Sequence, residues 1–176
     1  VVAHEDGMQP IGNGIGPALE AVDVLKVLKN EPDAPQDLKE ISIDLAGQIL
    51  EFSPKVKKGE GAKLAREILE SGKAYKKFQE IIEAQGDIRE IPVAKFTYDY
   101  LAKNSGSVVE IDNRKLSQAC RVAGAPESKV AGLYLYKHLN DQVKKGEKIF
   151  TIHSNSKGEL EQTIKFVEEN DLYKVK

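Results

Sequence analysis

The residues best placed to do chemistry are three glycines near the start of the chain, Gly12, Gly14 and Gly16. They precede a predicted helix, and backbone N–H groups at a helix N-terminus can hold an anion such as phosphate. A dinucleotide fingerprint needs its third glycine where Pro17 stands, and no Gly-Lys-Ser/Thr follows, so neither that fingerprint nor a P-loop is present. The pattern favours the alternative that the glycines allow tight turning and close packing beside a strand.

The other reactive side chains do not form a recognisable catalytic set. His4, His138 and His153 share no ligand spacing with one another or with Cys120, so no metal site is predicted. Cys120 falls on the apolar side of a short predicted helix, which is typical of a packed, unreactive thiol. Asp6 lies near the glycines and could act as a general acid or contact a ligand, although a lone carboxylate in a turn is more often solvated.

Composition excludes several classes of protein. The 176 residues include 26 Lys plus Arg and 28 Asp plus Glu, and a net charge of −2 offers no basic surface for nucleic acid. No apolar run approaches the roughly 18 residues of a membrane span. A single cysteine excludes an internal disulfide and fits a cytoplasmic location. The chain begins with Val1 and its one methionine is Met8, so we expect a piece processed or cut from a longer protein.

The first half of the chain predicts four helices. Breakers between Pro10 and Gly16 are expected to forbid regular structure there, and Pro17 opens a helix whose broad apolar girth predicts thorough burial. A second helix opens at Pro35. The four predicted helices cover about 17–28, 35–52, 62–70 and 73–86.

In the second half of the chain the spacing of apolar residues changes from the helical repeat to alternation, and the pattern predicts an α+β domain. Phe96, Tyr98 and Tyr100 alternate with polar residues, which predicts a half-buried strand. Asp112 or Asn113 is expected to cap a short helix that stops at Gly124. The further predicted elements are strands at 108–111, 133–139 and 149–152, a helix across 160–167 and an edge strand at 172–175. The boundary between the halves is predicted near 87–92.

The segment 139–150 resembles the turn of biotinyl and lipoyl carrier domains, where a hairpin re-enters a small sandwich. Those carriers display their lysine in a Met-Lys-Met or Asp-Lys-Ala setting, which this chain lacks. The turn geometry is therefore expected without carrier chemistry.

Taken together, these landmarks resemble the C-terminal part of the family II nucleoside phosphorylases, which include thymidine, pyrimidine-nucleoside and archaeal AMP phosphorylases. Pro17 is the form associated with AMP phosphorylase, and Asn140 stands where glycine is usual at the hairpin. The matching segments, in chain order, are Gln9-Pro10-Ile11-Gly12, Gly16-Pro17-Ala18-Leu19-Glu20-Ala21, Ser71-Gly72-Lys73-Ala74, Lys77-Phe78, Ala84-Gln85-Gly86, Ile111-Asp112-Asn113, Ala123-Gly124-Ala125-Pro126, Ala131-Gly132-Leu133, Val143-Lys144-Lys145-Gly146 and Phe150-Thr151-Ile152-His153.

The resemblance implies an α+β fold in two parts. Residues 1–88 would be the mostly helical end of the family's α/β phosphate-binding domain. Residues 92–176 would be its C-terminal α+β domain, an α/β-hammerhead with a barrel-sandwich-like hairpin. That relationship accounts for the carrier-like turn.

The resemblance also implies a glycosyltransferase activity for the parent enzyme: phosphorolysis of AMP or of a pyrimidine nucleoside such as thymidine. Inorganic phosphate is the co-substrate, no metal or redox cofactor is expected, and the parent is expected to form a homo-oligomer. The family's catalytic residues lie upstream, so none maps onto this chain and the fragment alone is expected to be inactive. We place four residues beside the substrate cleft: Asp6, Gln9, Gly12 and Gly14.

A second hypothesis comes from a different class of protein. The chain could be a non-catalytic binding or scaffold module built on the barrel-sandwich-like hairpin. The mass of the native protein would distinguish the two hypotheses, because a phosphorylase would be far heavier than 19.4 kDa. AMP and a pyrimidine nucleoside both remain open as the substrate.

Overall fold

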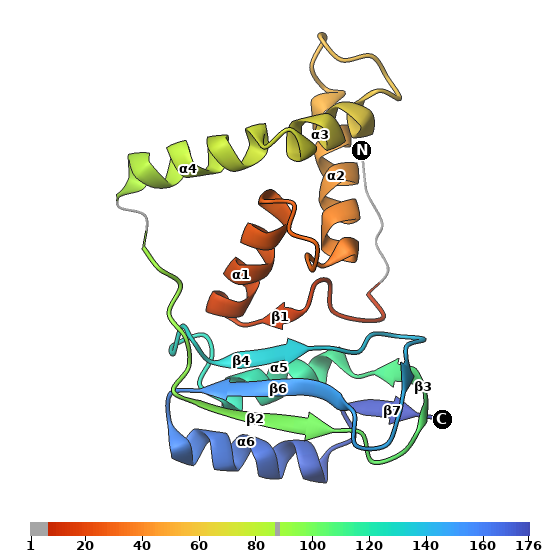
Figure 1. Cartoon of the computed structure of the whole chain (residues 1–176), viewed down its shortest axis with the longest axis vertical. Helices are drawn as coiled ribbons and strands as arrows, with labels where there is room; N and C mark the ends of the chain where they lie inside the picture. The colour runs from red at the N-terminus through yellow and green to blue at the C-terminus, as the bar shows by residue number, and fades with distance from the viewer. Residues whose placement is uncertain (1–6, 87–88) are drawn as a thin grey trace. The chain divides into compact units, whose positions relative to one another are not determined.

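The computed structural model describes residues 7–86 and 89–176 (Figure 1). His4 and Asp6, and part of the predicted boundary at 87–92, lie outside the described residues. Within those ranges the chain divides into two compact units, one comprising 23–86 with 89–90 and the other comprising 7–22 with 91–176. The assignment of 1–88 and 92–176 to two phosphorylase domains stays a prediction.

The four helices predicted for the first half are all present. They are α1 (Pro17–Leu28), α2 (Gln36–Leu50), α3 (Gly61–Glu70) and α4 (Lys73–Gln85). Pro17 is the first helical residue of α1, where its missing N–H costs nothing. The prediction that α1 is thoroughly buried was wrong, because Leu19, Val22 and Leu25 are only partly buried. The apolar surface of this helix exceeds what the described residues cover.

The helical unit packs around a small core made by Val27, Ala34, Ile43, Ala65 and Leu69. Helices α2 and α3 cross at unusually close range. A Cβ at Gly47 would lie 2.5 Å from the Ala62 nitrogen, closer than side chains approach backbone in proteins. Only glycine therefore allows this crossing.

The described part of the second unit contains two antiparallel sheets and two helices besides the start of α1, which confirms the predicted α+β class. The four-stranded sheet has the order β1-β4-β6-β2, and the three-stranded sheet has the order β5-β3-β7. The strands are β1 (Gly14–Ile15), β2 (Phe96–Leu101), β3 (Gly106–Ile111), β4 (Gly132–Leu135), β5 (Gln142–Val143), β6 (Lys148–Ser154) and β7 (Tyr173–Val175).

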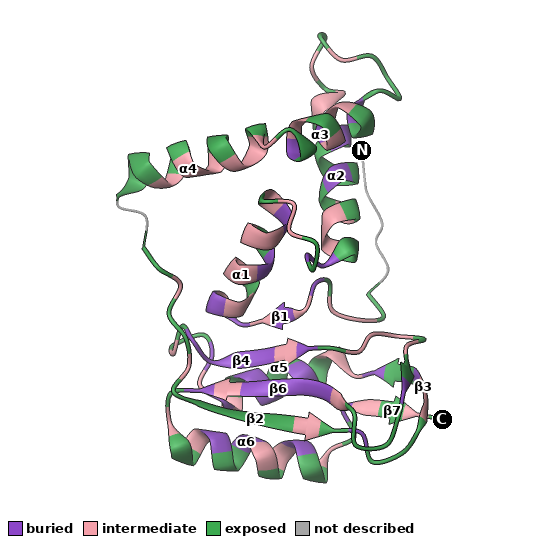
Figure 2. Cartoon of the chain, in the orientation of Figure 1, coloured by how far each residue is buried: buried purple, intermediate pink, exposed green. Residues whose placement is uncertain are grey.

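Helices α5 (Asn113–Val122) and α6 (Lys157–Glu169) contact each other and pack on the four-stranded sheet. Asp112, rather than Asn113, caps α5, because its carboxylate accepts from the backbone N–H groups of Arg114 and Lys115. The core joins these helices to β4 and β6, which are buried along most of their length (Figure 2).

Two details of the predicted second half were wrong. The strand predicted to be half-buried, β2, has exposed residues on both faces, because it lies at the end of its sheet (Figure 2). The strand predicted at 133–139 ends at Leu135, and the chain turns at Leu139 and Asn140. Asn140 adopts a φ of 72°, a conformation that asparagine tolerates better than most residues, so it can replace the usual glycine.

The segment between Pro10 and Pro17 also differs from expectation. Its breakers were predicted to forbid regular structure, yet Gly14 and Ile15 form β1, which pairs with Tyr134 and Leu133 of β4. Glycine lacks the side chain that would otherwise keep the two backbones apart, so the glycines permit this pairing rather than prevent it. None of the helices in the described ranges combines the length and the apolar character needed to cross a membrane.

Candidate functional site

The glycine segment is held against β4 by close backbone contact. Gly132 has a φ of +155°, and a Cβ there would lie 2.0 Å from the Ile15 carbonyl oxygen. Gly16 has a φ of +127°, and its Cβ would lie 2.3 Å from the Ala131 carbonyl oxygen. Two glycines facing each other across the pair thus set the distance between the strands. The prediction of close packing beside a strand is confirmed for Gly16.

Side chains of the same segment fasten it to residues that follow β4. The Gln9 Oε1 accepts a hydrogen bond from the Leu139 N–H at 2.8 Å. Asn13 contributes two contacts, donating from Nδ2 to the Tyr134 hydroxyl at 3.3 Å and placing Oδ1 2.9 Å from Nε2 of His138. The backbone oxygen of Asn13 also accepts from the Leu135 N–H at 2.7 Å. The segment is therefore fixed by backbone and side chains together.

The start of α1 bears directly on phosphate binding. The Gly16 N–H donates to the Glu20 carboxylate at 3.0 Å, and the Ala18 N–H donates to the Lys129 carbonyl at 2.9 Å. A phosphate at this helix N-terminus would need those donors and would meet the negative charge of Glu20. The arrangement favours a structural role for the glycine segment over an anion site.

The structure places the predicted cleft residues as follows. Gln9 is partly buried and bonded to Leu139, while Gly12 and Gly14 are buried, Gly12 with a φ of 75°. Asp6 lies outside the described residues. Sequence reasoning missed the partners of this segment, Tyr134 and His138, although the isolated Gly132 beside a predicted strand was a usable signal of close backbone approach.

Cys120 is buried, and its thiol lies 3.7 Å from the Ile15 carbonyl oxygen. Burial disfavours the thiolate and raises the pKa of Cys120 to about 12. The prediction of a packed, unreactive thiol agrees with this environment. Across residues 7–86 and 89–176, no three His, Cys, Asp or Glu side chains gather where they could hold a metal ion.

A polar cluster lies on the sheet between β2 and β6. Thr151 Oγ1 donates to the Asp99 carboxylate at 2.6 Å and lies 3.2 Å from the Tyr136 hydroxyl. Lys148 forms an ion pair with Asp99 at 2.8 Å. The hydrogen bonds from Lys148 and Thr151 lower the pKa of Asp99, whereas burial lowers the pKa of the nearby His153.

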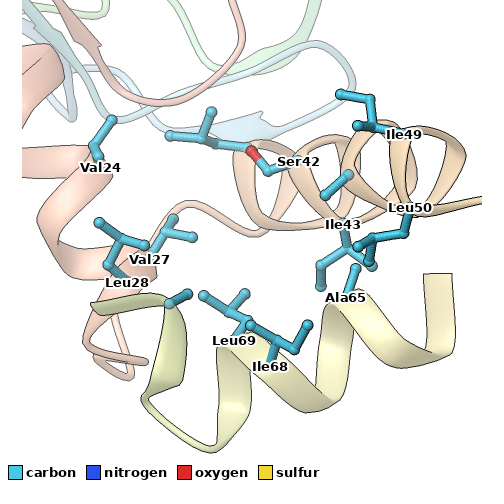
Figure 3. Close-up of a pocket in the computed structure, with 13 residues that line it drawn as sticks. Val24, Val27, Leu28, Ser42, Ile43, Ile49, Leu50, Ala65, Ile68 and Leu69 are labelled. Carbon is cyan, nitrogen blue, oxygen red and sulfur yellow. The ribbon is translucent and has the colours of Figure 1, made fainter. Parts of the chain in front are cut away.

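The helical unit carries an apolar groove of about 450 Å³ (Figure 3). Among the described residues that line it, Ser42 is the one polar side chain, so nothing there would orient a charged substrate. Ile49 on the rim is 68% exposed, and Phe52 just beyond α2 is 70% exposed. An apolar surface of this kind is typical of a packing interface rather than a catalytic site.

Comparison with known protein families finds a match in the second unit. Residues 107–174 match the model of the pyrimidine nucleoside phosphorylase C-terminal domain. The match covers most of β3, helices α5 and α6, strands β4, β5 and β6, and most of β7, but neither β1 nor β2. The resemblance to the C-terminal part of the family II nucleoside phosphorylases is thereby confirmed.

Individual relatives agree. The chain is 56% identical over 155 residues to a "Putative thymidine phosphorylase" of Legionella pneumophila (strain Corby). The aligned region covers 88% of this chain and 30% of the relative. It is 48% identical over 165 residues to a protein of the same name from Ralstonia nicotianae, covering 94% of this chain and 32% of the relative. The chain thus spans about a third of the length of the curated relatives it matches. The subgroup inference from Pro17 to AMP phosphorylase stays a prediction.

Proposed function

We propose that the chain is the C-terminal part of a nucleoside phosphorylase, a pentosyltransferase acting on thymidine or a related pyrimidine nucleoside. Phosphate attacks the anomeric carbon of the sugar, the N-glycosidic bond breaks, and the base leaves with a proton to give a sugar 1-phosphate. The observation that carries this proposal is the 56% identity, over 88% of the chain, to a relative named for thymidine phosphorolysis. AMP is the alternative substrate suggested by Pro17.

The apolar groove supports a longer parent polypeptide. Exposing Ile49 and Phe52 to water is unfavourable, and burial of each such side chain is worth roughly 1.5–3 kcal/mol. The part of the parent that corresponds to the remaining two thirds of the relatives would supply apolar side chains to cover them. On this proposal the helical unit completes the phosphate-binding domain.

We further propose that the chain supplies positioning residues and no catalytic ones. Gln9 and Asn13 are bonded to residues that follow β4. These bonds support the proposal that the segment is a rigid wall beside a substrate cleft whose other residues lie elsewhere in the parent. The proposed reaction needs inorganic phosphate and neither a metal nor a redox cofactor. A cytoplasmic, homo-oligomeric parent fits a nucleoside salvage role.

The test compares the 176-residue chain with the polypeptide encoded by its whole open reading frame. Each is incubated with inorganic phosphate and thymidine, uridine or AMP, and release of the free base is followed by chromatography. We expect base release from the longer polypeptide and none from the chain alone. Base release by the chain alone would refute the assignment of catalysis to other parts of the parent. A native product of 19.4 kDa would instead favour the scaffold hypothesis.

A further inference from the structure

Strand β2 presents an open edge to solvent. In the sheet formed by the described residues, the order β1-β4-β6-β2 places β2 at one end, paired with β6 alone. Five of its six residues are exposed. An edge strand of this length offers a row of backbone N–H and C=O groups to another strand.

Apolar side chains gather along the same edge. Phe96 and Tyr98 are 38% and 36% exposed, Leu101 is 48% exposed, and Val93 just before the strand is 85% exposed. Natural edge strands are usually protected by charges or prolines from pairing with other chains. Here Pro92 and Lys95 precede the strand, Lys103 follows it, and Asp99 is the one charged residue within it.

The sequence of this edge is complementary to itself in one antiparallel register. When Thr97 faces Thr97 of a second copy, Phe96 faces Tyr98 and Lys95 faces Asp99. Aromatic, threonine and opposite-charge pairs are the cross-strand combinations that stabilise sheets, by about 0.2–1 kcal/mol each. Extending the register by two positions brings Val93 opposite Leu101, so the exposed apolar residues also meet one another.

Neighbouring symmetric registers lack this match. Centring the pair on Asp99 would oppose two carboxylates and place Lys95 against Lys103, which is repulsive. Centring it on Tyr98 would place Lys95 against Leu101 and leave the lysine without a carboxylate. Charge therefore selects the register centred on Thr97.

We propose that β2 is a self-association edge, at which two copies of this chain pair antiparallel about Thr97. The result is one continuous eight-stranded sheet across a two-fold axis, in which the same surface serves both copies. Pro92 ends the ladder because it has no N–H to donate. Five to nine pairs bury less than a standard interface of about 1,600 Å², so the dimer is weak and depends on concentration.

The first experiment tests the register by disulfide capture. Residues directly opposite each other in antiparallel strands have Cα atoms about 4.5–5.5 Å apart, which a disulfide can span. We expect Thr97→Cys to form a covalent dimer within minutes of mild oxidation. The matched control is Val109→Cys, an exposed position on β3 of the other sheet. The native Cys120 is buried and does not compete.

The second experiment tests the charge pairing by sedimentation velocity of the 176-residue chain between about 10 μM and 1 mM. Lys95→Glu places like charges opposite each other twice in the dimer, and we expect a loss of about tenfold in the association constant. Lys103→Glu changes the net charge equally but lies beyond the paired residues, and it should change association less than about twofold. Far-UV circular dichroism checks that both variants remain folded.

The outcomes decide the proposal. A chain that stays monomeric across this range overturns it. So does disulfide capture that is as fast at position 109 as at position 97, or an equal effect of the two lysine substitutions. Preferential capture at position 97 together with selective weakening by Lys95→Glu supports it. Neither result depends on nucleoside phosphorylase activity.

Discussion

Asn13 Oδ1 lies 2.9 Å from Nε2 of His138, a contact that joins residues 125 positions apart. Because Asn13 Nδ2 donates to the Tyr134 hydroxyl, its Oδ1 is the acceptor and His138 donates from Nε2. One amide thus uses both of its ends to hold β1 beside β4. This contact, and not an anion site, is the most specific feature of the glycine segment.

Replacing Asn13 should loosen that attachment. We expect Asn13→Ala to lower the free energy of unfolding by about 1–2 kcal/mol, since two side-chain hydrogen bonds are lost and His138 keeps a partly buried donor. Urea denaturation followed by circular dichroism measures the change. Asn104→Ala, at an exposed turn position, serves as the control and should alter stability by less than about 0.5 kcal/mol. Equal stability of the two variants would contradict the role given to Asn13.

Adding one methyl group at Gly47 should disturb the helical unit. Alanine normally favours a helix over glycine by about 1 kcal/mol, but here the new Cβ would lie 2.5 Å from the Ala62 nitrogen. We expect Gly47→Ala to lose about 1–3 kcal/mol in urea denaturation. The matched control is Gly158→Ala in the first turn of α6, where the nearest atom would be 3.9 Å away and stability should hold or rise. A stabilised Gly47→Ala variant would rule out the close crossing of α2 and α3.

The burial of His153 predicts a dependence of stability on pH. Burial lowers the folded-state pKa of His153 below its ordinary value of 6.5, so the unfolded chain binds more protons in the interval between the two. The contribution of His153 to the free energy of unfolding is therefore fully present above pH 6.5 and is lost as the pH falls below that value. We expect His153→Gln to lose less stability than the parent chain between about pH 7.5 and pH 5.5, as measured by urea denaturation. Parallel pH profiles for the two chains would show that burial of this ring has no such effect.

The thiol of Cys120 should be inert while the chain is folded. With a pKa of about 12, its thiolate fraction near pH 8 is roughly a thousandfold below that of an ordinary cysteine. We expect an aromatic disulfide reagent to label Cys120 only as urea unfolds the chain. In the Val109→Cys variant the exposed added thiol should react at once, which confirms that the reagent is active. Rapid labelling of the folded parent chain would mean that Cys120 is accessible.

The sequence predicted the elements better than their partners. Helical periodicity located α2 through apolar residues such as Leu38 and Ile41, because burial of one face repeats every three to four residues. It did not single out Ile43, the apolar residue of α2 that the structure buries. The α+β class and the family resemblance followed from similarly local patterns. Pairing of β1 with β4 did not, because a strand of two residues, Gly14 and Ile15, is too short to show a periodicity. The exposure of β2 was missed for a related reason: alternation predicts a strand but not its place in the sheet.

The fastening of the glycine segment has a consequence for synthesis of the chain. Asn13 and Tyr134 are 121 positions apart, and translation at about 5–20 residues per second separates their appearance by about 6–24 s. During that interval β1 has been synthesised and its partner strand does not yet exist. The glycines are suited to this delay, since a short glycine-rich segment has little tendency to aggregate before β4 has been synthesised.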